Sequence, residues 1–387
     1  MLDRSEIQQL LERVRAFEAP MLSLFVQSNP ARAENNPRGV AIRAVNGMKH
    51  AGAPAEVVNA IRARIDNNPL PARTLAVFAT QDAGAIEMIG LDVELPVDDP
   101  QEKEALAHWG EPFTAPLLMA IDGHRRAGVA YVDGDHWRFF EATPGSITEL
   151  ASDERDRWPI EQQGTSDRVP TNKADRGDAA RDLHAAYVDD HRHRFHKDAA
   201  RQIAELCDER GLSGLVVVSP NKDAHDFVPL LPKPLRDRVL GTVSAAPRSD
   251  APPDEIRRKV ADLLRQSEVA REEALLDTAQ ERGVSGLDAC LEQLQQGRVR
   301  TLLMGLRNEA TVFWAQLDAD TAFVATDAKK ARAPFSAQNG DVTVKELPAR
   351  VALPRLAERF GTRVELVDGT PRERLEDEHG GVAGLLR

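Results

Sequence analysis

The part of the sequence that most constrains the fold is residues 161–219, which combine a polar segment, a long helix and a short apolar strand. Residues 161–177 contain almost no hydrophobic residue that could join a core, so we expect a loop that projects into solvent. From residue 178, apolar side chains recur at spacings of three, four or seven, which is typical of a helix with one buried stripe. Residues 214–219 then predict a strand buried on both faces. A long loop carried by a rigid helix is suited to reach a site on another molecule.

Cationic side chains gather on one side of this predicted helix. Arg194, Lys197 and Arg201 are expected to share a face, with Arg192 beside it. Between residues 191 and 201 there are four Lys or Arg and one Asp, so the local charge is positive. Two interpretations stay open: a face that is simply solvated, which is the usual role of such a surface, or a contact for an anionic partner.

Length, charge and cysteine content limit the class of protein. A chain of 387 residues predicts two or three domains, and a formal net charge of -12 argues against a protein that coats nucleic acid indiscriminately. No apolar run approaches membrane length and the first residues lead into a polar helix, so we expect neither a membrane span nor a signal segment. Cys207 and Cys290 lie on separate predicted helices, which argues against a disulfide framework and fits a reducing cytoplasm.

The order of predicted elements gives an α/β protein of three domains. A small N-terminal α/β domain is expected over residues 1–112. Its predicted helices are 3–18, 39–50 and 54–67, and its predicted strands are 21–26, 74–79 and 85–89. A middle mixed-sheet α/β domain is expected over residues 113–250, with the projecting loop at 161–177. It opens with a predicted three-stranded meander, and its predicted strands are 116–122, 127–132, 136–141, 214–219 and 239–243.

Residues 251–284 predict a long connecting helix that begins behind Pro252 and Pro253. A C-terminal αβα sandwich is expected over residues 285–387. Its predicted helices are 287–296 and 350–360, and its predicted strands are 299–304, 321–326 and 363–368. The acidic segment 373–379 is expected to be mobile, and residues 380–386 are expected to dock on the domain.

Three histidines are the nearest approach to a metal site in the sequence. Of His191, His193 and His196, only the last two share a helical face, and no cysteine or carboxylate completes a familiar ligand set. Ser219 follows a buried strand but lacks the sequence of a nucleophile elbow. No glycine pattern suits a pyrophosphate. We therefore predict no metal, no cofactor and no catalytic residue.

Three segments resemble the bacterial branch of the archaeo-eukaryotic class-1 release factor and Pelota superfamily. They are the strands from Leu117 to Phe140, the helix and strand from Arg194 to Val218, and the segment from Leu287 to Leu303. The last is the most specific, because its ending Gly-x-Val-x-Thr-Leu-Leu is similar to the opening of the third domain in that superfamily. The closing residues 380–387 resemble the ending found in the branch of Balon-type ribosome hibernation factors.

The resemblance implies a release-factor-like middle domain, a Pelota-like C-terminal domain and binding in the ribosomal A site. It implies that the middle domain reaches the peptidyl-transferase centre, that the N-terminal domain lies on the decoding side, and that the C-terminal domain faces elongation factor Tu or another translational GTPase. Release factors carry Gly-Gly-Gln at the tip of the matching loop and Asn-Ile-Lys-Ser in the first domain. This chain has Gln162-Gln163-Gly164 in that loop and neither of the two motifs.

We therefore expect a monomeric, cytoplasmic translation factor that binds the A site of vacant or stalled 70S ribosomes in hibernation, stress or rescue. Without the two motifs we expect no stop-codon reading and no ester hydrolysis, hence no enzyme. The residues expected to contact ribosomal RNA are Gln162, Gln163, Gly164, Thr165, Ser166, Arg168, Lys173, Arg176, Arg192, Arg194, Lys197 and Arg201.

Two alternatives stay open on the sequence. One is a release or rescue factor that hydrolyses peptidyl-tRNA through a divergent loop, with Gln162 or Gln163 holding the water. The other is a rescue adaptor that recruits a GTPase or a nuclease to stalled ribosomes.

Overall fold

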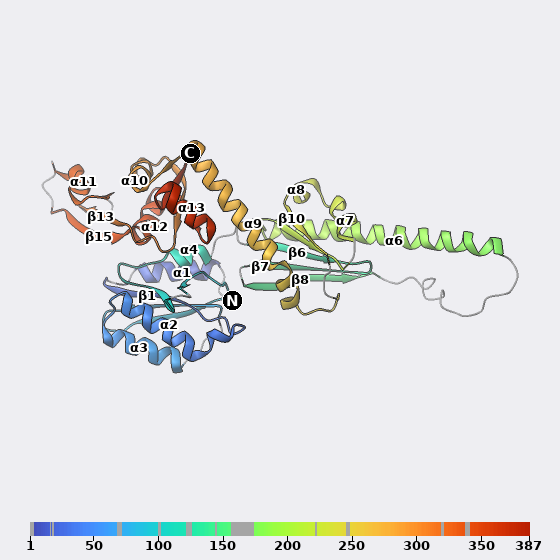
Figure 1. Cartoon of the computed structure of the whole chain (residues 1–387), viewed down its shortest axis with the longest axis horizontal. Helices are drawn as coiled ribbons and strands as arrows, with labels where there is room; N and C mark the ends of the chain where they lie inside the picture. The colour runs from blue at the N-terminus through green and yellow to red at the C-terminus, as the bar shows by residue number, and fades with distance from the viewer. Residues whose placement is uncertain are drawn as a thin grey trace. The chain divides into compact units, whose positions relative to one another are not determined.

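The chain folds into two compact units of mixed α/β structure (Figure 1). The computed structural model describes residues 4–15, 17, 19–67, 72–99, 102–120, 126–143, 145–155, 174–220, 223–244, 248–318, 321–336 and 341–387. One unit comprises Met1–Asp122 with Val269–Arg387, and the other comprises Gly123–Glu268. The predicted α/β fold class is confirmed.

The N-terminal part of the first unit is an antiparallel sheet of order β3-β2-β1-β5-β4. Helices α2 and α3 pack on one face of this sheet, and α1 packs on the other. The elements are α1 (Arg4–Arg15), β1 (Met21–Gln27), α2 (Pro37–His50), α3 (Ala55–Asn67), β2 (Thr74–Thr80), β3 (Ile86–Leu91), β4 (Asp98–Asp99) and β5 (Glu104–Gly110). The elements predicted before residue 91 are confirmed. Strands β4 and β5 were not predicted, because apolar and polar residues do not alternate clearly in them.

The predicted strand at residues 116–122 is wrong, because residues Ala115–Ala120 form helix α4. A short apolar run cannot be assigned to a strand or to a buried helix by periodicity alone. Here Pro116 lies in the first turn of the helix, a position that proline favours. Leu117 and Met119 of α4 are buried in the core of the first unit.

The C-terminal part of the first unit contains two sheets. In the larger, of order β11-β17-β12-β16, strand β12 pairs antiparallel with β17 and parallel with β16. The smaller is antiparallel, of order β14-β13-β15. The elements are α9 (Pro253–Arg282), β11 (Gly283–Ser285), α10 (Leu287–Gln295), β12 (Val299–Gly305), β13 (Thr311–Gln316), β14 (Ala322–Ala325), α11 (Ala328–Arg332), β15 (Thr343–Pro348), α12 (Ala349–Arg359), β16 (Arg363–Val367), α13 (Thr370–His379) and β17 (Val382–Leu386).

Helices cover both faces of the larger sheet, as the predicted αβα sandwich requires. Residues of α10 and α12 pack on one face, and residues of α13 and the C-terminal end of α9 pack on the other. The helices and strands predicted between residues 251 and 368 are confirmed within a few residues, while β13 and β15 were not predicted.

The mobile acidic tail predicted at residues 373–379 is wrong, because this segment belongs to α13. Arg374 forms ion pairs with Glu273 at 2.6 Å, with Asp277 at 2.8 Å and with Glu378 at 2.9 Å. Arg374 thus binds α13 to two acidic side chains of α9 and also pairs with Glu378 within α13. The residues that follow, predicted only to dock, form β17, which lies between β11 and β12.

The N-terminal and C-terminal parts of the first unit share one apolar core. Leu10 of α1, Leu117 of α4 and Leu353 of α12 belong to the same buried cluster. Burying such side chains contributes about 1.5–3 kcal/mol each, so this shared cluster is a strong link between the two parts.

Arginine and glutamate side chains add polar contacts across the same junction. The Arg350 guanidinium lies 5.1 Å from the Phe113 ring centroid, and its Nη2 donates to the Ala107 carbonyl at 3.4 Å. Glu111 accepts hydrogen bonds from Lys345 Nζ at 2.5 Å and from Arg355 Nη1 at 3.4 Å. The apolar cluster and these polar contacts together fix the two parts as one unit.

The second unit is a five-stranded mixed sheet of order β10-β9-β6-β7-β8. Strands β6, β9 and β10 are parallel, and β6, β7 and β8 form an antiparallel meander. Helices α6 and α7 pack on one face, and the N-terminal half of α9 packs on the other. The elements are β6 (Ala127–Val132), β7 (His136–Thr143), β8 (Ser146–Glu154), α6 (Ala174–Glu209), β9 (Leu215–Val218), α7 (Asp223–Phe227), α8 (Lys233–Arg236) and β10 (Val239–Val243).

The predicted meander therefore exists, but one strand later in the sequence. Its third strand is β8, whose residues were not assigned to a predicted strand. The long helix begins at Ala174, so the last four residues of the predicted loop belong to α6. The predicted strand at 214–219 is confirmed as β9, with all four of its residues buried.

His108 of β5 makes the stability of the first unit depend on pH. Burial lowers the pKa of His108 to about 4, and the nearby Arg350 guanidinium acts in the same direction. In the unfolded chain the imidazole has a pKa of about 6.5. The stability that depends on a neutral His108 is therefore fully present above that pH and is lost as the pH falls towards 4. We expect a loss of about 2 kcal/mol between about pH 7.5 and about pH 5.

The measurement compares urea unfolding of the wild-type chain and of His108→Gln at these two pH values. Glutamine does not titrate, so the difference between the free energies of unfolding of the two proteins should change by about 2 kcal/mol. Parallel pH dependences would contradict the assignment of this effect to His108.

Candidate nucleic-acid interface

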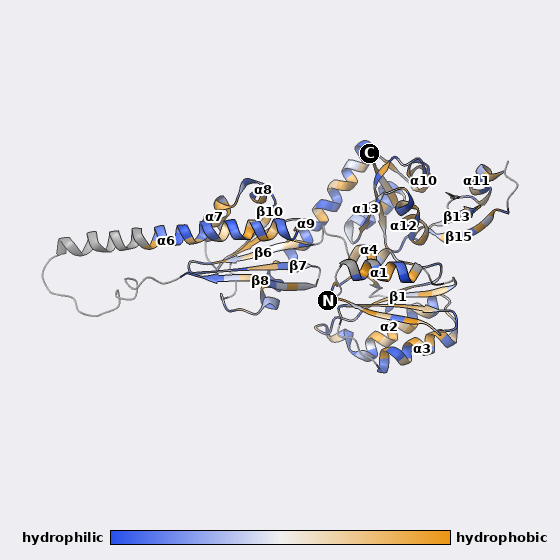
Figure 2. Ribbon diagram, turned by 180° about the vertical axis from the view of Figure 1, so that it is seen from behind, coloured by the Kyte–Doolittle hydropathy of each residue, from blue (hydrophilic) through white to orange (hydrophobic). Residues whose placement is uncertain are grey.

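Helix α6 is held to its sheet by its C-terminal half. With 36 residues it is about 54 Å long. Ala199, Ile203 and Cys207 are fully buried on α6, where they pack with Trp137 and Phe139 of β7. Two of these three residues have small side chains, which let the helix lie close to the sheet. In Figure 2 the coloured part of α6 carries both hydrophilic and hydrophobic residues, whereas β6 is coloured towards the hydrophobic end.

The structure brings Arg194, Lys197 and Arg201 together on the exposed face of α6. All three are exposed, and their spacing of three and four residues places them on the side opposite the buried stripe. Arg192 is not part of this face. It is half-buried, and its Nε lies 3.2 Å from the position that a Cβ would take at Gly134, in the turn between β6 and β7.

Acidic residues on the same face partly neutralise these cations. Arg194 Nη2 lies 2.7 Å from Asp190 Oδ2, and Arg201 Nη1 lies 3.7 Å from Glu205 Oε1. Among the residues that the structure describes, Lys197 has no ion pair. Exposed pairs of this kind are worth about 0–1 kcal/mol, so an RNA phosphate can replace the carboxylate at little cost.

His196 connects α6 to the turn between β6 and β7. It is buried, its Nε2 donates a hydrogen bond to the Asp133 carbonyl at 2.8 Å, and its ring packs edge-on against Phe227 at 5.9 Å. His193, three residues earlier on the same helix, is exposed. Among the described residues no group of three His, Cys, Asp or Glu side chains is arranged to hold a metal ion.

The same turn also holds the last residue before the segment 156–173. Arg155 Nη2 donates to Asp135 Oδ1 at 2.6 Å, and the Arg155 backbone N–H donates to the Asp135 carbonyl at 2.7 Å. Asp133 Oδ1 accepts the backbone N–H groups of Asp135 and His136 at 2.9 and 2.7 Å. The residue that leads into the segment and the helix that follows it are therefore bound to one rigid turn.

Tyr131, on β6, also contacts this turn. Its hydroxyl donates to Asp133 Oδ2 at 3.2 Å. Burial raises the pKa of Tyr131, and the adjacent carboxylate of Asp133 raises it further, so the phenol remains a proton donor.

Most of the predicted loop contacts lie outside the described residues. These are Gln162, Gln163, Gly164, Thr165, Ser166, Arg168 and Lys173, while Arg176 lies within α6 but its side chain is not among those described.

The sequence analysis missed His196 and Arg155 as the residues that position this region. For His196 a signal was present, because it precedes Ala199 and Ile203 of the buried stripe by three and seven residues. No sequence signal links Arg155 to Asp135, since their pairing depends on the sheet.

Neither cysteine is a candidate nucleophile. Burial raises the pKa of both Cys207 and Cys290 to about 12, so both remain thiols.

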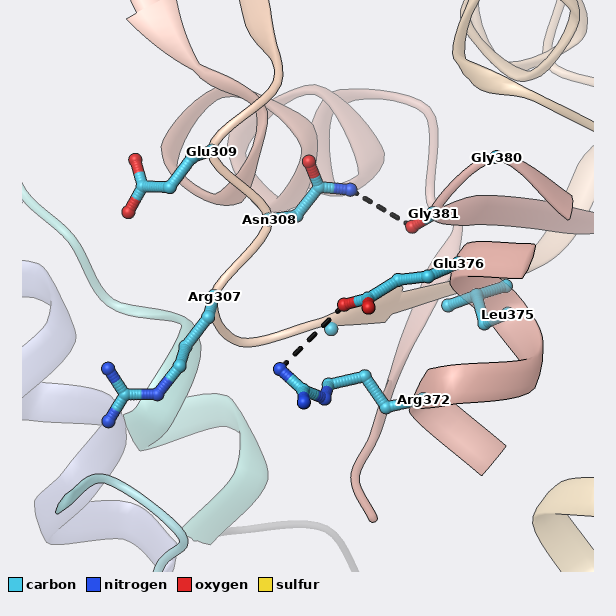
Figure 3. A pocket seen from close by; sticks show the side chains of 9 residues that line it. Arg307, Asn308, Glu309, Arg372, Leu375, Glu376, Gly380 and Gly381 are labelled. Carbon is cyan, nitrogen blue, oxygen red and sulfur yellow. Dashed lines mark hydrogen bonds and ion pairs between the residues drawn. The ribbon is translucent and has the colours of Figure 1, made fainter. Parts of the chain in front are cut away.

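A pocket of about 300 Å³ lies in the C-terminal part of the first unit (Figure 3). Several of its polar side chains have partners: Arg372 Nη1 lies 3.7 Å from Glu376 Oε1, Arg307 donates to the Val97 carbonyl at 2.9 Å, and Asn308 donates to the Gly381 carbonyl at 2.9 Å. Among the described residues, Arg372 Nε is buried without a hydrogen-bond partner. The residues that line it provide neither a nucleophile with an adjacent base nor a set of metal ligands. We therefore do not place the candidate site here.

None of the helices in the described part of the chain has the length and apolar character needed to cross a bilayer.

The fold and the site define a multidomain α/β protein in which a long helix borders a mixed sheet. Residues 112–265 of the 387 match the family model described as bacterial archaeo-eukaryotic release factor family 10. The matched segment contains the whole sheet of the second unit and α6. Over these residues the match bears out the predicted resemblance to the bacterial archaeo-eukaryotic release factors, and nothing in the match separates the Balon-type branch. No curated protein matched the sequence.

Solved structures of archaeal and yeast proteins are similar over nearly the whole chain. An archaeal translation termination factor, aRF1, is 17% identical, with 99% of this chain and 97% of that chain covered and a TM-score of 0.28. Pelota of Archaeoglobus fulgidus is 13% identical, with 98% and 92% covered and a TM-score of 0.34. Dom34 of S. cerevisiae is 8% identical, with 98% and 93% covered and a TM-score of 0.42. At these identities and TM-scores, no property of the three proteins is carried over to this chain.

The role of His196 can be tested against a neighbouring histidine. His196→Ala removes a buried ring and leaves the Asp133 carbonyl without its donor, so we expect the second unit to lose about 2–4 kcal/mol of stability. His193→Ala changes an exposed side chain on the same helix and should have little effect. Hydrogen exchange followed by mass spectrometry on the full chain should show faster exchange over residues 127–143 and 188–209 in the first variant only. Equal protection in both variants would refute the positioning role.

Proposed function

We propose that this chain is a ribosome-binding translation factor that occupies the A site of vacant or stalled 70S ribosomes, in hibernation, stress or rescue. The observation that carries the proposal is the match of residues 112–265, the region built around α6, to a release factor family. The exposed cations of α6 supply point charges and guanidinium groups for ribosomal RNA phosphates, for which no base-specific contact is needed.

The arrangement of the second unit supports a role for segment 156–173 at a site on the ribosome. The turn between β6 and β7 binds Arg155, which directly precedes this segment, and His196 of α6, the helix that follows it, so both flanking parts are attached to the same sheet. The loop contacts predicted from the sequence, from Gln162 to Arg176, remain part of the proposal.

We further propose that the factor does not hydrolyse peptidyl-tRNA. The sequence contains no Gly-Gly-Gln, the motif that positions water in the release factors it resembles. It contains no Asn-Ile-Lys-Ser either, so stop-codon reading is not part of the proposal. The proposed setting is the bacterial cytoplasm, and the proposed partner of the C-terminal part is elongation factor Tu or another translational GTPase.

Charge reversal on α6 tests the proposal. Arg194→Glu, Lys197→Glu and Arg201→Glu in one chain place three repulsive charges where three phosphate contacts are proposed, and we expect binding to vacant 70S ribosomes to weaken about 10- to 100-fold. The matched control replaces Arg194 and Arg201 by Lys, which keeps the charge and should retain most of the affinity. Co-sedimentation over a salt series measures both. Undiminished binding by the reversed protein would contradict the proposal.

The same ribosome preparation, loaded with peptidyl-tRNA, tests the absence of hydrolysis. We expect no release of the peptide by the wild-type chain. Release that is abolished by Gln162→Ala and Gln163→Ala would instead establish a peptidyl-tRNA hydrolase.

A further inference from the structure

Four arginines gather at one end of the larger C-terminal sheet, at the start of β12, the start of β16 and the end of β17. We refer to Arg298, Arg300, Arg363 and Arg387 as the arginine cluster. None of them belongs to the contacts proposed above.

Backbone pairing and hydrogen bonds bring these four positions together. The Arg387 N–H donates to the Arg298 carbonyl at 2.9 Å, and Thr301, next to Arg300, pairs with Arg363 across the parallel strands. The Arg387 guanidinium donates through Nη2 to the carbonyls of Phe360 and Gly361 at 2.9 and 3.1 Å. The cluster is thus a feature of the folded sheet, formed by residues far apart in sequence.

Few acidic groups offset this charge. Arg363 Nη2 lies 3.2 Å from Glu365 Oε2, but Glu365 is buried and also pairs with Arg271 at 2.6 Å. Arg298 and Arg300 are exposed, and within the described ranges neither has a carboxylate at ion-pair distance. The cluster is therefore positive on a chain with a net charge of -12.

Protection of a sheet edge does not explain Arg300, although Arg363 lies on the edge strand β16. Charged side chains often prevent edge strands from pairing with other molecules, but β12 lies between β17 and β16. The pairing of β12 with β17 shifts register between Val299 and Thr301, at Arg300. Such bulges re-aim a side chain, and here the exposed side chain is Arg300.

We propose that the arginine cluster binds RNA phosphates, as a second RNA contact of this chain. The proposal rests on the proposed ribosome binding and adds a contact from the C-terminal part. All four cations are arginines, whose planar guanidinium groups offer paired donors that match phosphate oxygens. Salt-dependent attraction to phosphate is strongest where exposed cations lack acidic partners, as Arg298 and Arg300 do.

The test uses the full chain with Arg298→Glu and Arg300→Glu, and a control with Arg298→Lys and Arg300→Lys. Arg363 and Arg387 are left unchanged because their side chains contact the fold. The probe is a fluorescein-labelled RNA hairpin, titrated over a series of salt concentrations. Each phosphate contact contributes roughly 0.7–0.9 to the slope of log K against log salt, so the loss of two contacts should make the slope of the Glu variant shallower by about 1.4–1.8. The Lys control should keep the wild-type slope.

A second arm repeats the titration with vacant 70S ribosomes, alongside the reversed α6 variant. We expect the cluster variant to bind ribosomes about 10-fold or more weakly than wild type. Suppose that the Glu variant of the cluster binds both the hairpin and the ribosome as tightly as the wild type does, while the reversed α6 variant does not bind the ribosome. The cluster proposal is then overturned and the proposed function stands. If the wild-type chain does not bind ribosomes, the proposed function fails, and the hairpin arm still decides the cluster. Binding of polyglutamate in place of the hairpin would overturn the RNA assignment.

Discussion

The packing of α6 on the second sheet is the constraint on which the proposed site depends. Small buried residues such as Ala199 bring the helix close to the strands, and His196 donates a hydrogen bond to the Asp133 carbonyl. The turn that contains Asp133 also binds Arg155, so the residue that precedes segment 156–173 and the helix that follows it have a common support. This support holds the exposed cations of α6 at a fixed position on the second unit.

The first unit is organised by a different constraint, an apolar core shared by segments from both ends of the chain. Helix α4 contributes Leu117 and Met119 to this core, and Arg350 and Glu111 add polar contacts around it. The match to the release factor family spans residues 112–265. It therefore includes α4 and the sheet of the second unit, but few of the residues that form the shared core of the first unit. The arginine cluster of the C-terminal part lies at the ends of β12, β16 and β17.

The sequence predicted the parts of the fold that periodicity alone determines. The buried stripe of α6 and the long helix α9 were found because their apolar spacing extends over many turns. Helix α4 was taken for a strand because its short apolar run carries no decisive period. Arg192 was placed beside the cationic face although residues two apart on a helix point about 200° apart, which put it on the packed side. The contacts of Arg155 depend on strand pairing and could not be predicted from local sequence.

The central claim is that this chain occupies the ribosomal A site, and competition for that site tests it most directly. Purified protein is co-sedimented with vacant 70S ribosomes and with the same ribosomes after the A site has been filled with a non-hydrolysable aminoacyl-tRNA. The account predicts binding to the vacant ribosomes and its loss when the tRNA is present, with displacement that depends on tRNA concentration. Equal binding to both kinds of ribosome would contradict it.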